Sequence, residues 1–267
     1  MQNFTNKVAV ITGAGSGIGR ALTLNLAQRG AKLALNDYNA DTLAETEKMA
    51  TEQGAEVLTQ AFDVSDAQAF AAFGEAILAK YSQVDIVVNN AGVTTASDRM
   101  FDDLSLEDVE WVLNINLNGV VYGSKIFLPH LKKRPEASLV NISSIFGIVG
   151  IPGQVPYCTT KFAVRGFNEA LWLELQKTGV RVLSVHPGGI KTNIARNARY
   201  SEDNQRFVKR FEEKLTPTTP EEAAEVIVQG IIQKKRRVLI GKDAKRMNRF
   251  RTLYPKAIWK AVSKGVK

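Results

Sequence analysis

The chain alternates short apolar runs with longer segments whose apolar residues recur at helical spacing. Seven continuous runs rich in Val, Ile and Leu are expected to form strands buried on both faces. They cover residues 7–12, 31–36, 56–62, 84–89, 138–143, 180–186 and 237–240. Because strands and helices alternate along the chain, the pattern predicts an α/β fold with a doubly wound parallel sheet (a Rossmann fold) of about seven strands and helices on both faces.

Several predicted helices begin with residues that typically cap a helix N-terminus. Ser65 with Gln68, and Ser105 with Asp108, resemble capping boxes, and residues 219–222 (TPEE) offer an N-cap, a proline at the first helical position and an acid at the third.

No linker or repeat divides the chain, so we interpret residues 1–241 as a single dinucleotide-binding and catalytic domain. Residues 191–218 are the one long irregular stretch. A loop of that size in a compact domain is usually a functional lid or a poorly ordered segment, and we interpret this one as a substrate lid.

Composition narrows the class of protein. Apolar residues make up 45% of the chain, enough for one large core. The single cysteine, Cys158, excludes an internal disulfide and a CxxC metal site, and the isolated His130 and His186 do not suggest a metal centre, so no metal is predicted. A polar N-terminal segment and the lack of a run of about 18 apolar residues make the cytoplasm the expected location.

Charge is distributed unevenly. The net charge is +8, yet residues 231–267 alone carry +12 and the remaining residues carry −4. A nucleic-acid binder would be basic over its whole body, whereas here the excess positive charge lies in the C-terminal segment, so no nucleic-acid partner is expected.

A glycine-rich turn, TGAGSGIG (12–19), joins the first predicted strand to the first helix. In a doubly wound sheet this turn holds a dinucleotide pyrophosphate on the helix N-terminus, and glycines let backbone N–H groups approach the phosphates. Close helix–strand packing without a ligand is the alternative. The candidate cofactor-binding residues here are Gly13, Ser16, Gly17, Ile18 and Gly19.

Asp37 ends the second predicted strand, where an acid can accept hydrogen bonds from the adenosine ribose hydroxyls. Alone it could simply begin a helix; together with the glycine turn it favours a ligand. Its carboxylate would repel the 2′-phosphate of NADP, and Ser16, Asn36 and Tyr38 offer no basic partner. NAD(H) is therefore predicted over NADP(H).

Five further motifs follow in order. They are NNAG (89–92), NLNGV (116–120), SIFG (144–147), YxxxK (157–161) and HPGGIKT (186–192). With TGAGSGIG they make the chain, from about residue 5 to residue 240, resemble the short-chain dehydrogenase/reductase family.

The resemblance implies a catalytic set of Asn116, Ser144, Tyr157 and Lys161. Tyr157 would move a proton to or from the substrate oxygen, which Ser144 would hydrogen-bond. Lys161, one helical turn from Tyr157, would lower the phenol pKa together with an oxidised nicotinamide and hold the nicotinamide ribose. Asn116 would anchor a water, although a buried Asn that satisfies backbone groups is the alternative. The spacing to Gly147 and Tyr157 selects Ser144 over the adjacent Ser143.

Further cofactor contacts and an assembly follow from the resemblance. Members of the family are mostly homo-oligomers, so a homodimer or homotetramer that pairs helices 105–131 and 155–176 is expected. His186 is expected to be structural, and Cys158 a packing residue rather than a redox switch. The additional cofactor-binding residues implied are Asp63, Val64, Asn90, Ala91, Gly92, Pro187, Gly188, Ile190 and Thr192.

The substrate is indicated less clearly. Residues 94–101, 145–155 and 191–215 would line its pocket, and the middle stretch, IFGIVGIPGQV, is apolar and uncharged. We therefore predict an NAD(H)-dependent oxidoreductase that interconverts a hydrophobic alcohol and its ketone or aldehyde. Arg196 and Arg199 could instead bind an anionic group. The alternatives are an NADP(H)-dependent carbonyl reductase and a non-catalytic nucleotide-binding or membrane-surface protein.

The C-terminal extension, residues 242–267, has the pattern of a basic amphipathic segment. It could lie weakly on an anionic membrane, giving a peripheral location at the inner membrane surface. It could equally pack on the protein's own sheet, cap the pocket or form an interface. Its apolar positions are Met247, Phe250, Leu253, Tyr254, Ile258 and Val262.

Overall fold

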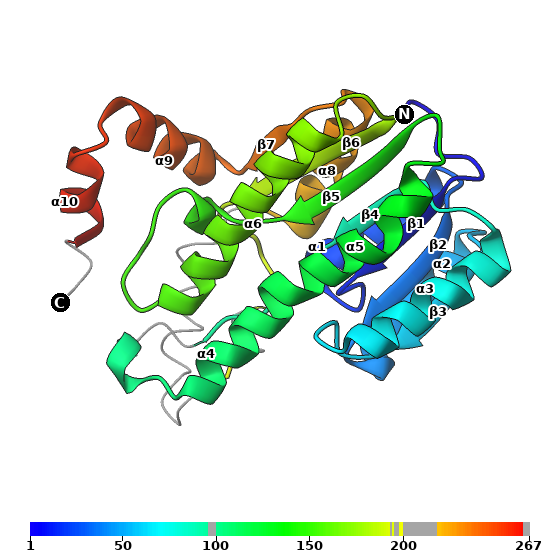
Figure 1. Cartoon of the computed structure of the whole chain (residues 1–267), viewed down its shortest axis with the longest axis horizontal. Coiled ribbons are helices and arrows are strands. Elements are labelled where there is room, and N and C mark those ends of the chain that lie inside the picture. The colour runs from blue at the N-terminus through cyan, green and yellow to red at the C-terminus, as the bar shows by residue number, and fades with distance from the viewer. Residues whose placement is uncertain (96–99, 193, 195–197, 200–217, 264–267) are drawn as a thin grey trace.

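A seven-stranded parallel sheet forms the centre of the computed structural model, which describes residues 1–95, 100–192, 194, 198–199 and 218–263 (Figure 1). The strands lie in the order β3-β2-β1-β4-β5-β6-β7, and every neighbouring pair is parallel. Each predicted strand forms within two residues of its expected bounds. The strands are β1 (Val8–Thr12), β2 (Lys32–Asp37), β3 (Val57–Ala61), β4 (Ile86–Asn89), β5 (Ala137–Ile142), β6 (Val180–Pro187) and β7 (Arg237–Ile240).

Helices cover both faces of the sheet, as Figure 1 shows. On one face α1 (Gly17–Gln28) packs between α2 (Ala40–Glu52) and α8 (Pro220–Ile232), and their apolar residues share one buried cluster with the sheet. On the other face α3 (Ala67–Tyr81), α5 (Gly119–Leu131) and α6 (Val155–Glu174) bury a second cluster. The interior strands are continuous apolar runs because both of their faces meet a helix layer.

The strand order reverses between β1 and β4. From β1 the chain winds outward through β2 and β3, then returns to β4 and continues to the opposite edge. In such sheets the loops at the carboxyl ends of the strands diverge at this reversal and leave a crevice in which ligands bind. The predicted site residues follow the carboxyl ends of β1 to β6, so the topology gathers them at this edge.

The start signals are confirmed at two helices and wrong at one. Thr219 and Glu222 form a reciprocal capping box, and the Ser105 hydroxyl accepts from the Asp108 amide at the start of α4 (Leu106–Leu113). For α3 the N-cap is Asp66, not Ser65, because the Asp66 carboxylate accepts from two amides of the first turn. Ser65 is instead held by Asp63.

The remaining helical segments connect or extend the two layers. A π-helical turn, η2 (Asn114–Asn118), joins α4 to α5, and short 3₁₀ turns stand at η1 (Phe101–Asp103) and η3 (Ile145–Gly147). Beyond β7, α9 (Lys242–Leu253) and α10 (Ala257–Ser263) extend past the sheet, at the left of Figure 1. Within the described part of the chain, no helix has both the length and the apolar character that crossing a membrane requires.

Candidate active site

The turn from β1 to α1 leaves backbone amides at the start of α1 without a side-chain cap, at the carboxyl edge of the sheet. Ser16 is the N-cap of α1, but its side chain makes no capping hydrogen bond, and the first turn holds no acidic residue. Gly17 has a φ of 52°, and a Cβ there would lie 2.9 Å from Thr192 Cγ2. A Cβ on Gly19 would lie 2.0 Å from the Gly13 carbonyl oxygen. An uncapped helix N-terminus that side chains cannot fill fits a pyrophosphate group.

Asp37 lies against this turn. Its Oδ2 accepts a hydrogen bond from the Gly15 amide at 2.8 Å, and its Oδ1 accepts from the Asn39 amide at 3.0 Å. The basic residue Arg20 reaches toward α2, where Glu45 pairs with it at 2.8 Å. Because the Asp37 carboxylate is hydrogen-bonded to the Gly15 amide, one ligand can touch both this carboxylate and the glycine turn, as the cofactor prediction requires.

Asn90 ties the end of β4 to the end of β1. Its Nδ2 donates to the carbonyl oxygens of Thr12 at 2.9 Å and Gly13 at 3.1 Å. In return, the Thr12 hydroxyl accepts from the amides of Asn90 at 3.0 Å and Ala91 at 3.1 Å. Thr12 was not among the predicted site residues, although its place as the first residue of TGAGSGIG was a usable signal. The clamp holds residues 90–92 beside the glycine turn.

Three predicted cofactor residues have side chains that are buried or already engaged. Ile18 and Val64 are 9% and 6% exposed and belong to the two apolar clusters, so their backbone is what they can offer a ligand. The Asp63 carboxylate accepts from the Ser65 amide and hydroxyl. The Phe62 amide donates to the Asp37 carbonyl at 3.2 Å, which places residues 63–64 beside the end of β2.

The loop after β6 brings four of the predicted cofactor-binding residues, Pro187, Gly188, Ile190 and Thr192, to the same edge. Pro187 ends β6, and Ile190 is buried and forms a bridge with Thr218. Thr192 then comes back against Gly17, as the 2.9 Å approach above records. The loop after the sixth strand thus meets the loop after the first.

Asp243, at the start of α9, hydrogen-bonds the backbone of this loop. Its Oδ2 accepts from the Gly189 amide at 2.7 Å, and a Cβ on Gly188 would lie 2.1 Å from the same oxygen. Asp243 was not among the predicted site residues. A signal was present, because Asp243 is the only acidic residue in 231–267.

Tyr157 and Lys161 lie one turn apart on α6, with Lys161 Nζ 5.4 Å from the centre of the Tyr157 ring. Lys161 is 3% exposed and donates to the Ile142 carbonyl at 3.0 Å. Burial lowers the pKa of Lys161 to about 8. Burial also raises the pKa of Tyr157 to about 12, against a smaller opposing effect of a hydrogen bond with Ser144.

The expectation that Lys161 and an oxidised nicotinamide together lower the phenol pKa stays a prediction. The free-energy cost of burying a phenolate exceeds the stabilisation that Ser144 supplies. Bringing the Tyr157 pKa toward neutrality requires further positive charge beside the ring, as the prediction with an oxidised nicotinamide supposed.

The two adjacent serines have different partners. The Ser143 hydroxyl donates to the Lys161 carbonyl at 2.7 Å, deep in the protein. The Ser144 hydroxyl accepts from the Phe146 amide at 3.1 Å and has Tyr157 as its hydrogen-bond neighbour. This arrangement agrees with the choice of Ser144, rather than Ser143, as the candidate beside the phenol.

Asn116 sits in the π-helical turn η2 and is fully buried. Its Oδ1 accepts from the Val93 amide at 2.7 Å, and its Nδ2 donates to the Val93 carbonyl at 2.8 Å. A Cβ on Gly92 would lie 3.2 Å from Asn116 Oδ1 and 3.4 Å from Lys161 Nζ, so Asn116 lies close to the lysine. The contacts to Val93 belong to the alternative reading, in which this Asn satisfies backbone groups.

A row of buried polar side chains runs through the protein and ends at Ser144. Its members, in order, are Asn89, Asn141, Asn168, Ser184 and His186. Successive distances between their hydrogen-bonding atoms are 2.7, 2.6, 3.0 and 2.9 Å. At the end of the row, His186 Nδ1 lies 2.9 Å from the Ser144 carbonyl oxygen.

The row assigns a tautomer to His186. Asn168 Nδ2 donates to the Ser184 hydroxyl, so the hydroxyl proton is available to His186 Nε2. That leaves Nδ1 to carry the ring proton and donate it to the Ser144 carbonyl. Burial is the main cause that lowers the His186 pKa to about 4, so the ring is neutral near pH 7.

The apolar stretch at residues 145–155 is partly used by the fold. Ile145, Ile148 and Val149 share a buried cluster with Ala244 of α9 and Ile258 of α10. Phe146 meets the Tyr157 ring edge-on, with the ring centres 6.3 Å apart. Only some of the apolar residues in 145–155 are therefore available to line a substrate pocket.

Arg199, suggested as an anion ligand, is engaged elsewhere. Its guanidinium lies 4.5 Å from the centre of the Trp111 ring and pairs with Glu107 at 3.1 Å and Asp108 at 3.7 Å. Arg196 and most of the predicted lid lie outside the described residues.

Gln154 links two of the predicted pocket loops. Its Oε1 accepts from the Thr94 hydroxyl at 2.6 Å, and its Nε2 donates to the Thr95 carbonyl at 3.1 Å. The loop after β4 is thereby fastened to the start of the helix that carries Tyr157.

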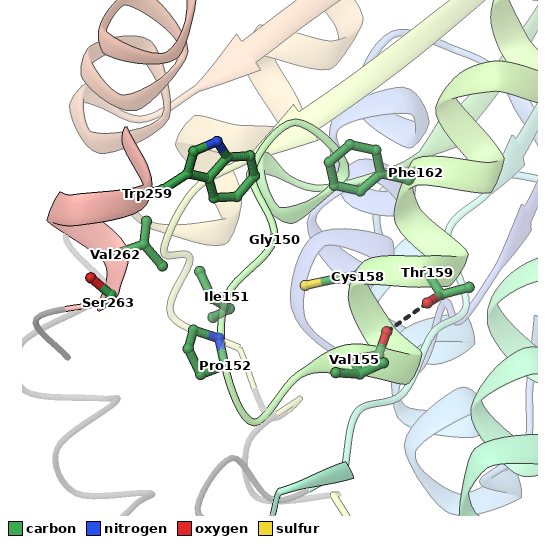
Figure 2. Close-up of a pocket in the computed structure, with 10 residues that line it drawn as sticks. All are labelled: Gly150, Ile151, Pro152, Val155, Cys158, Thr159, Phe162, Trp259, Val262 and Ser263. Atoms are coloured by element: carbon green, nitrogen blue, oxygen red, sulfur yellow. Dashed lines mark hydrogen bonds between the residues drawn. The ribbon is translucent and has the colours of Figure 1, made fainter. Parts of the chain in front are cut away.

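An apolar groove of about 690 Å³ lies beside the same helix, as Figure 2 shows. Its floor is the loop Gly150–Pro152, one wall is α6 and the other is α10. Cys158, the residue after Tyr157, lines it with its thiol. Burial raises the pKa of this thiol.

The chain is similar to known proteins over most of its length. Residues 7–203 match the sequence profile of a family described as short chain dehydrogenase. The chain is 43% identical to SadH of Mycobacterium tuberculosis, named as an oxidoreductase, over 100% of the chain and 97% of SadH. It is 35% identical to the 3-oxoacyl-acyl-carrier-protein reductase FabG of Thermotoga maritima, over 83% of the chain and 89% of FabG.

A solved structure extends the likeness to three dimensions. A short chain dehydrogenase/reductase from Burkholderia phymatum, in complex with NAD, superposes with a TM-score of 0.87 at 28% identity. The superposition covers 95% of each chain.

Proposed function

The chain belongs to the short-chain dehydrogenase family, and from this premise we propose that it is an NAD(H)-dependent oxidoreductase that interconverts a hydrophobic alcohol and its ketone or aldehyde. One observation carries the proposal. Tyr157, Lys161 and Ser144 meet at the carboxyl edge of the sheet, beside an open glycine turn that fits a dinucleotide.

Tyr157 is the proton carrier in this proposal. During reduction its hydroxyl gives a proton to the carbonyl oxygen of the substrate, and during oxidation it takes the proton back from the alcohol. The hydroxyl of Ser144 hydrogen-bonds the same oxygen and stabilises the negative charge that develops there. When bound, the nicotinamide ring gives or takes the hydride.

Lys161 serves two purposes. Its ammonium lies 5.4 Å from the centre of the phenol ring, so its charge favours the phenolate once a cofactor changes the surroundings. The same ammonium is proposed to hydrogen-bond the ribose hydroxyls next to the nicotinamide. Asn116, fastened to Val93 beside Gly92, keeps this part of the site in shape.

The proposed preference for NAD(H) rests on Asp37. Its carboxylate lies against the glycine turn and would repel a 2′-phosphate, while the nearby Arg20 is paired with Glu45. The Burkholderia phymatum relative, whose structure holds NAD, supports the same choice. The other proposed cofactor residues are Gly13, Ser16, Gly17, Ile18, Gly19, Asp63, Val64, Asn90, Ala91, Gly92, Pro187, Gly188, Ile190 and Thr192.

A hydrophobic substrate is favoured by the surroundings of Tyr157. Phe146 packs against the phenol ring, and the neighbouring loop consists mainly of Ile, Val and Gly. Since several of these residues are buried against α9 and α10, Phe146 is the apolar contact on which the proposal chiefly relies.

A homo-oligomer is proposed through the faces of α4 and the C-terminal half of α6. Leu106 is 78% exposed and Leu173 is 60% exposed, and large apolar side chains left so open suit a contact with a second copy. Val120, within the expected helix 105–131, is buried in the chain's own core and is not available for such a contact. Met247, Phe250, Ile258 and Val262 of the C-terminal extension pack with the cluster around Ile145, whereas Leu253 and Tyr254 are each 56% exposed. Contact with an anionic membrane would therefore rest on the basic residues of the extension and these two exposed side chains; sedimentation with acidic-lipid vesicles at low and high salt tests it.

The proposed activity is tested with purified protein and a panel of apolar ketones and aldehydes. We expect kcat/KM to be higher with NADH than with NADPH, and higher for apolar carbonyls than for charged ones of similar size. A higher kcat/KM with NADPH would overturn the cofactor assignment, and no turnover of any carbonyl would overturn the activity.

A further inference from the structure

We propose that the groove between α6 and α10 binds the hydrocarbon chain of a single-chain anionic amphiphile, a long-chain carboxylate. This ligand is not the reacting substrate, and the proposal does not depend on the cofactor or the activity proposed above.

The groove has the size and the lining of a ligand site. Its volume of about 690 Å³ lies within the range of about 300–1,000 Å³ usual for small-molecule pockets. Val155, Cys158 and Phe162 line it from α6, while Trp259 and Val262 line it from α10. Figure 2 shows these side chains around one common space. Because the described residues of the lining include no charged side chain, an apolar chain is the fitting content.

The groove stays open to solvent despite its apolar walls. Val155 and Phe162 are each 41% exposed and Trp259 is 52% exposed. Large apolar side chains that remain exposed together in this way commonly mark a binding surface. A hydrocarbon chain laid between the two helices would cover all three.

Positive charge stands at the rim on the side of α10. The Arg251 guanidinium lies 5.5 Å from the centre of the Trp259 ring, which lines the groove. Residues 242–263 carry seven Lys or Arg and one acid, Asp243, which is already bonded to the Gly189 amide. Within the described ranges, none of these seven basic side chains has an ion-pair partner. An anionic head on the chain would therefore find a complementary charge.

The groove is distinct from the candidate catalytic pocket. Tyr157 turns its ring toward Ser144 and Lys161, whereas the next residue, Cys158, turns its thiol into the groove. A ligand in the groove can thus be detected at Cys158 without any turnover.

The chain supplies a single reporter, because Cys158 is its only cysteine. The experiment follows alkylation of Cys158 in the full-length protein by N-ethylmaleimide at mildly alkaline pH, with sodium laurate added below its micelle concentration. Only the free form should react, so laurate at about ten times its dissociation constant is expected to slow alkylation about tenfold.

Two series of probes separate the chain from the head group. From octanoate to decanoate to laurate, protection should strengthen by about two- to fourfold for each added methylene. Butyrate should give none, and dodecyltrimethylammonium, which has the same chain with a cationic head, should protect more weakly than laurate.

Matched variants locate the ligand. Thr159→Trp places an indole in the groove and should abolish protection by laurate, whereas Ala76→Trp adds the same group to an exposed position of α3 and should leave it unchanged. Arg251→Gln should raise the laurate concentration for half protection by about two- to fivefold, a factor usual for an exposed charge pair. Lys177→Gln, an exposed lysine elsewhere, should not change it.

Two results would overturn the proposal. Equal protection by the cationic and anionic amphiphiles would remove the role of the basic rim. If the rate of Cys158 alkylation fell with rising protein concentration and did not change with laurate concentration, the groove would instead be a contact between copies of the chain. Since Tyr157→Phe should keep laurate protection intact, failure of the activity proposal and failure of this one can be told apart.

Discussion

His186 Nδ1 lies 2.9 Å from the carbonyl oxygen of Ser144, and neither group reaches solvent. The imidazole stands at the end of a row of side chains that begins on β4 and crosses β5, α6 and β6. The backbone position of the candidate catalytic serine is thereby fastened to the centre of the sheet.

We predict that His186→Leu lowers kcat by about tenfold or more and leaves the affinity for NADH nearly unchanged. Leucine cannot donate to the Ser144 carbonyl, and an unpaired buried carbonyl costs about 1–3 kcal/mol. His186→Asn, whose Nδ2 can take the place of Nδ1, should retain most of the activity. Steady-state kinetics and calorimetric titration of the three proteins check this; equal losses in both variants would contradict the positioning role.

Asp37→Ala combined with Tyr38→Arg should weaken or reverse the preference for NAD(H), because Tyr38 is 79% exposed beside Asp37. The repelling carboxylate is removed and a partner for the 2′-phosphate is introduced. The measurement is the ratio of kcat/KM with NADH to that with NADPH, compared with the ratio for Tyr38→Arg alone. If the ratio did not move in the double variant, Asp37 would have no part in cofactor choice.

The affinity for NADH should fall as pH rises through about 8. Burial lowers the Lys161 pKa to about 8, so the ammonium is present below this pH and lost above it. If the ammonium hydrogen-bonds the cofactor ribose, binding favours the protonated form and weakens once the proton is lost. Fluorescence titration of NADH across this range is the measurement.

Lys161→Met is the control for that pH dependence. It should bind NADH more weakly than the parent protein at neutral pH and show no inflection near pH 8, and its turnover should be severely reduced. Unchanged NADH affinity in Lys161→Met would argue against the ribose contact.

Leu106→Asp with Leu173→Asp should convert the proposed oligomer to monomer. Both leucines are exposed on neighbouring helices, and charges introduced there would have to be desolvated in a contact. Light scattering at micromolar concentration gives the mass of each protein, with Ala76→Asp as the control for an added surface charge. A monomeric parent protein would refute the prediction at once.

Strand positions were predictable because strands buried on both faces must be continuous apolar runs. The N-cap of α3 was not predictable, because Ser65 and Asp66 can both cap a helix. Asp66 is the cap because Asp63 in the preceding turn already hydrogen-bonds Ser65. Local sequence cannot choose between two adjacent side chains of similar capacity.

Candidate site residues were predictable where the backbone itself must approach a ligand or where spacing places two side chains on one helix face. The supports of the site were less so. Asp243 and Thr12 act through contacts between residues more than 50 positions apart, so the local signals at these two positions did not by themselves indicate their partners. The apolar stretch after Ser144 also misled in part, because a run that could line a pocket could equally pack under α9 and α10.

The most direct test of Tyr157 as the proton carrier is the substitution Tyr157→Phe. The substitution removes the hydroxyl and keeps the ring, so packing against Phe146 and Lys161 should survive. We expect turnover of the best carbonyl substrate to fall by about 10²–10⁴-fold, the usual contribution of a general acid or base, while the dissociation constant of NADH stays within about twofold. Turnover within tenfold of the parent enzyme would contradict the assignment of Tyr157 as the proton carrier.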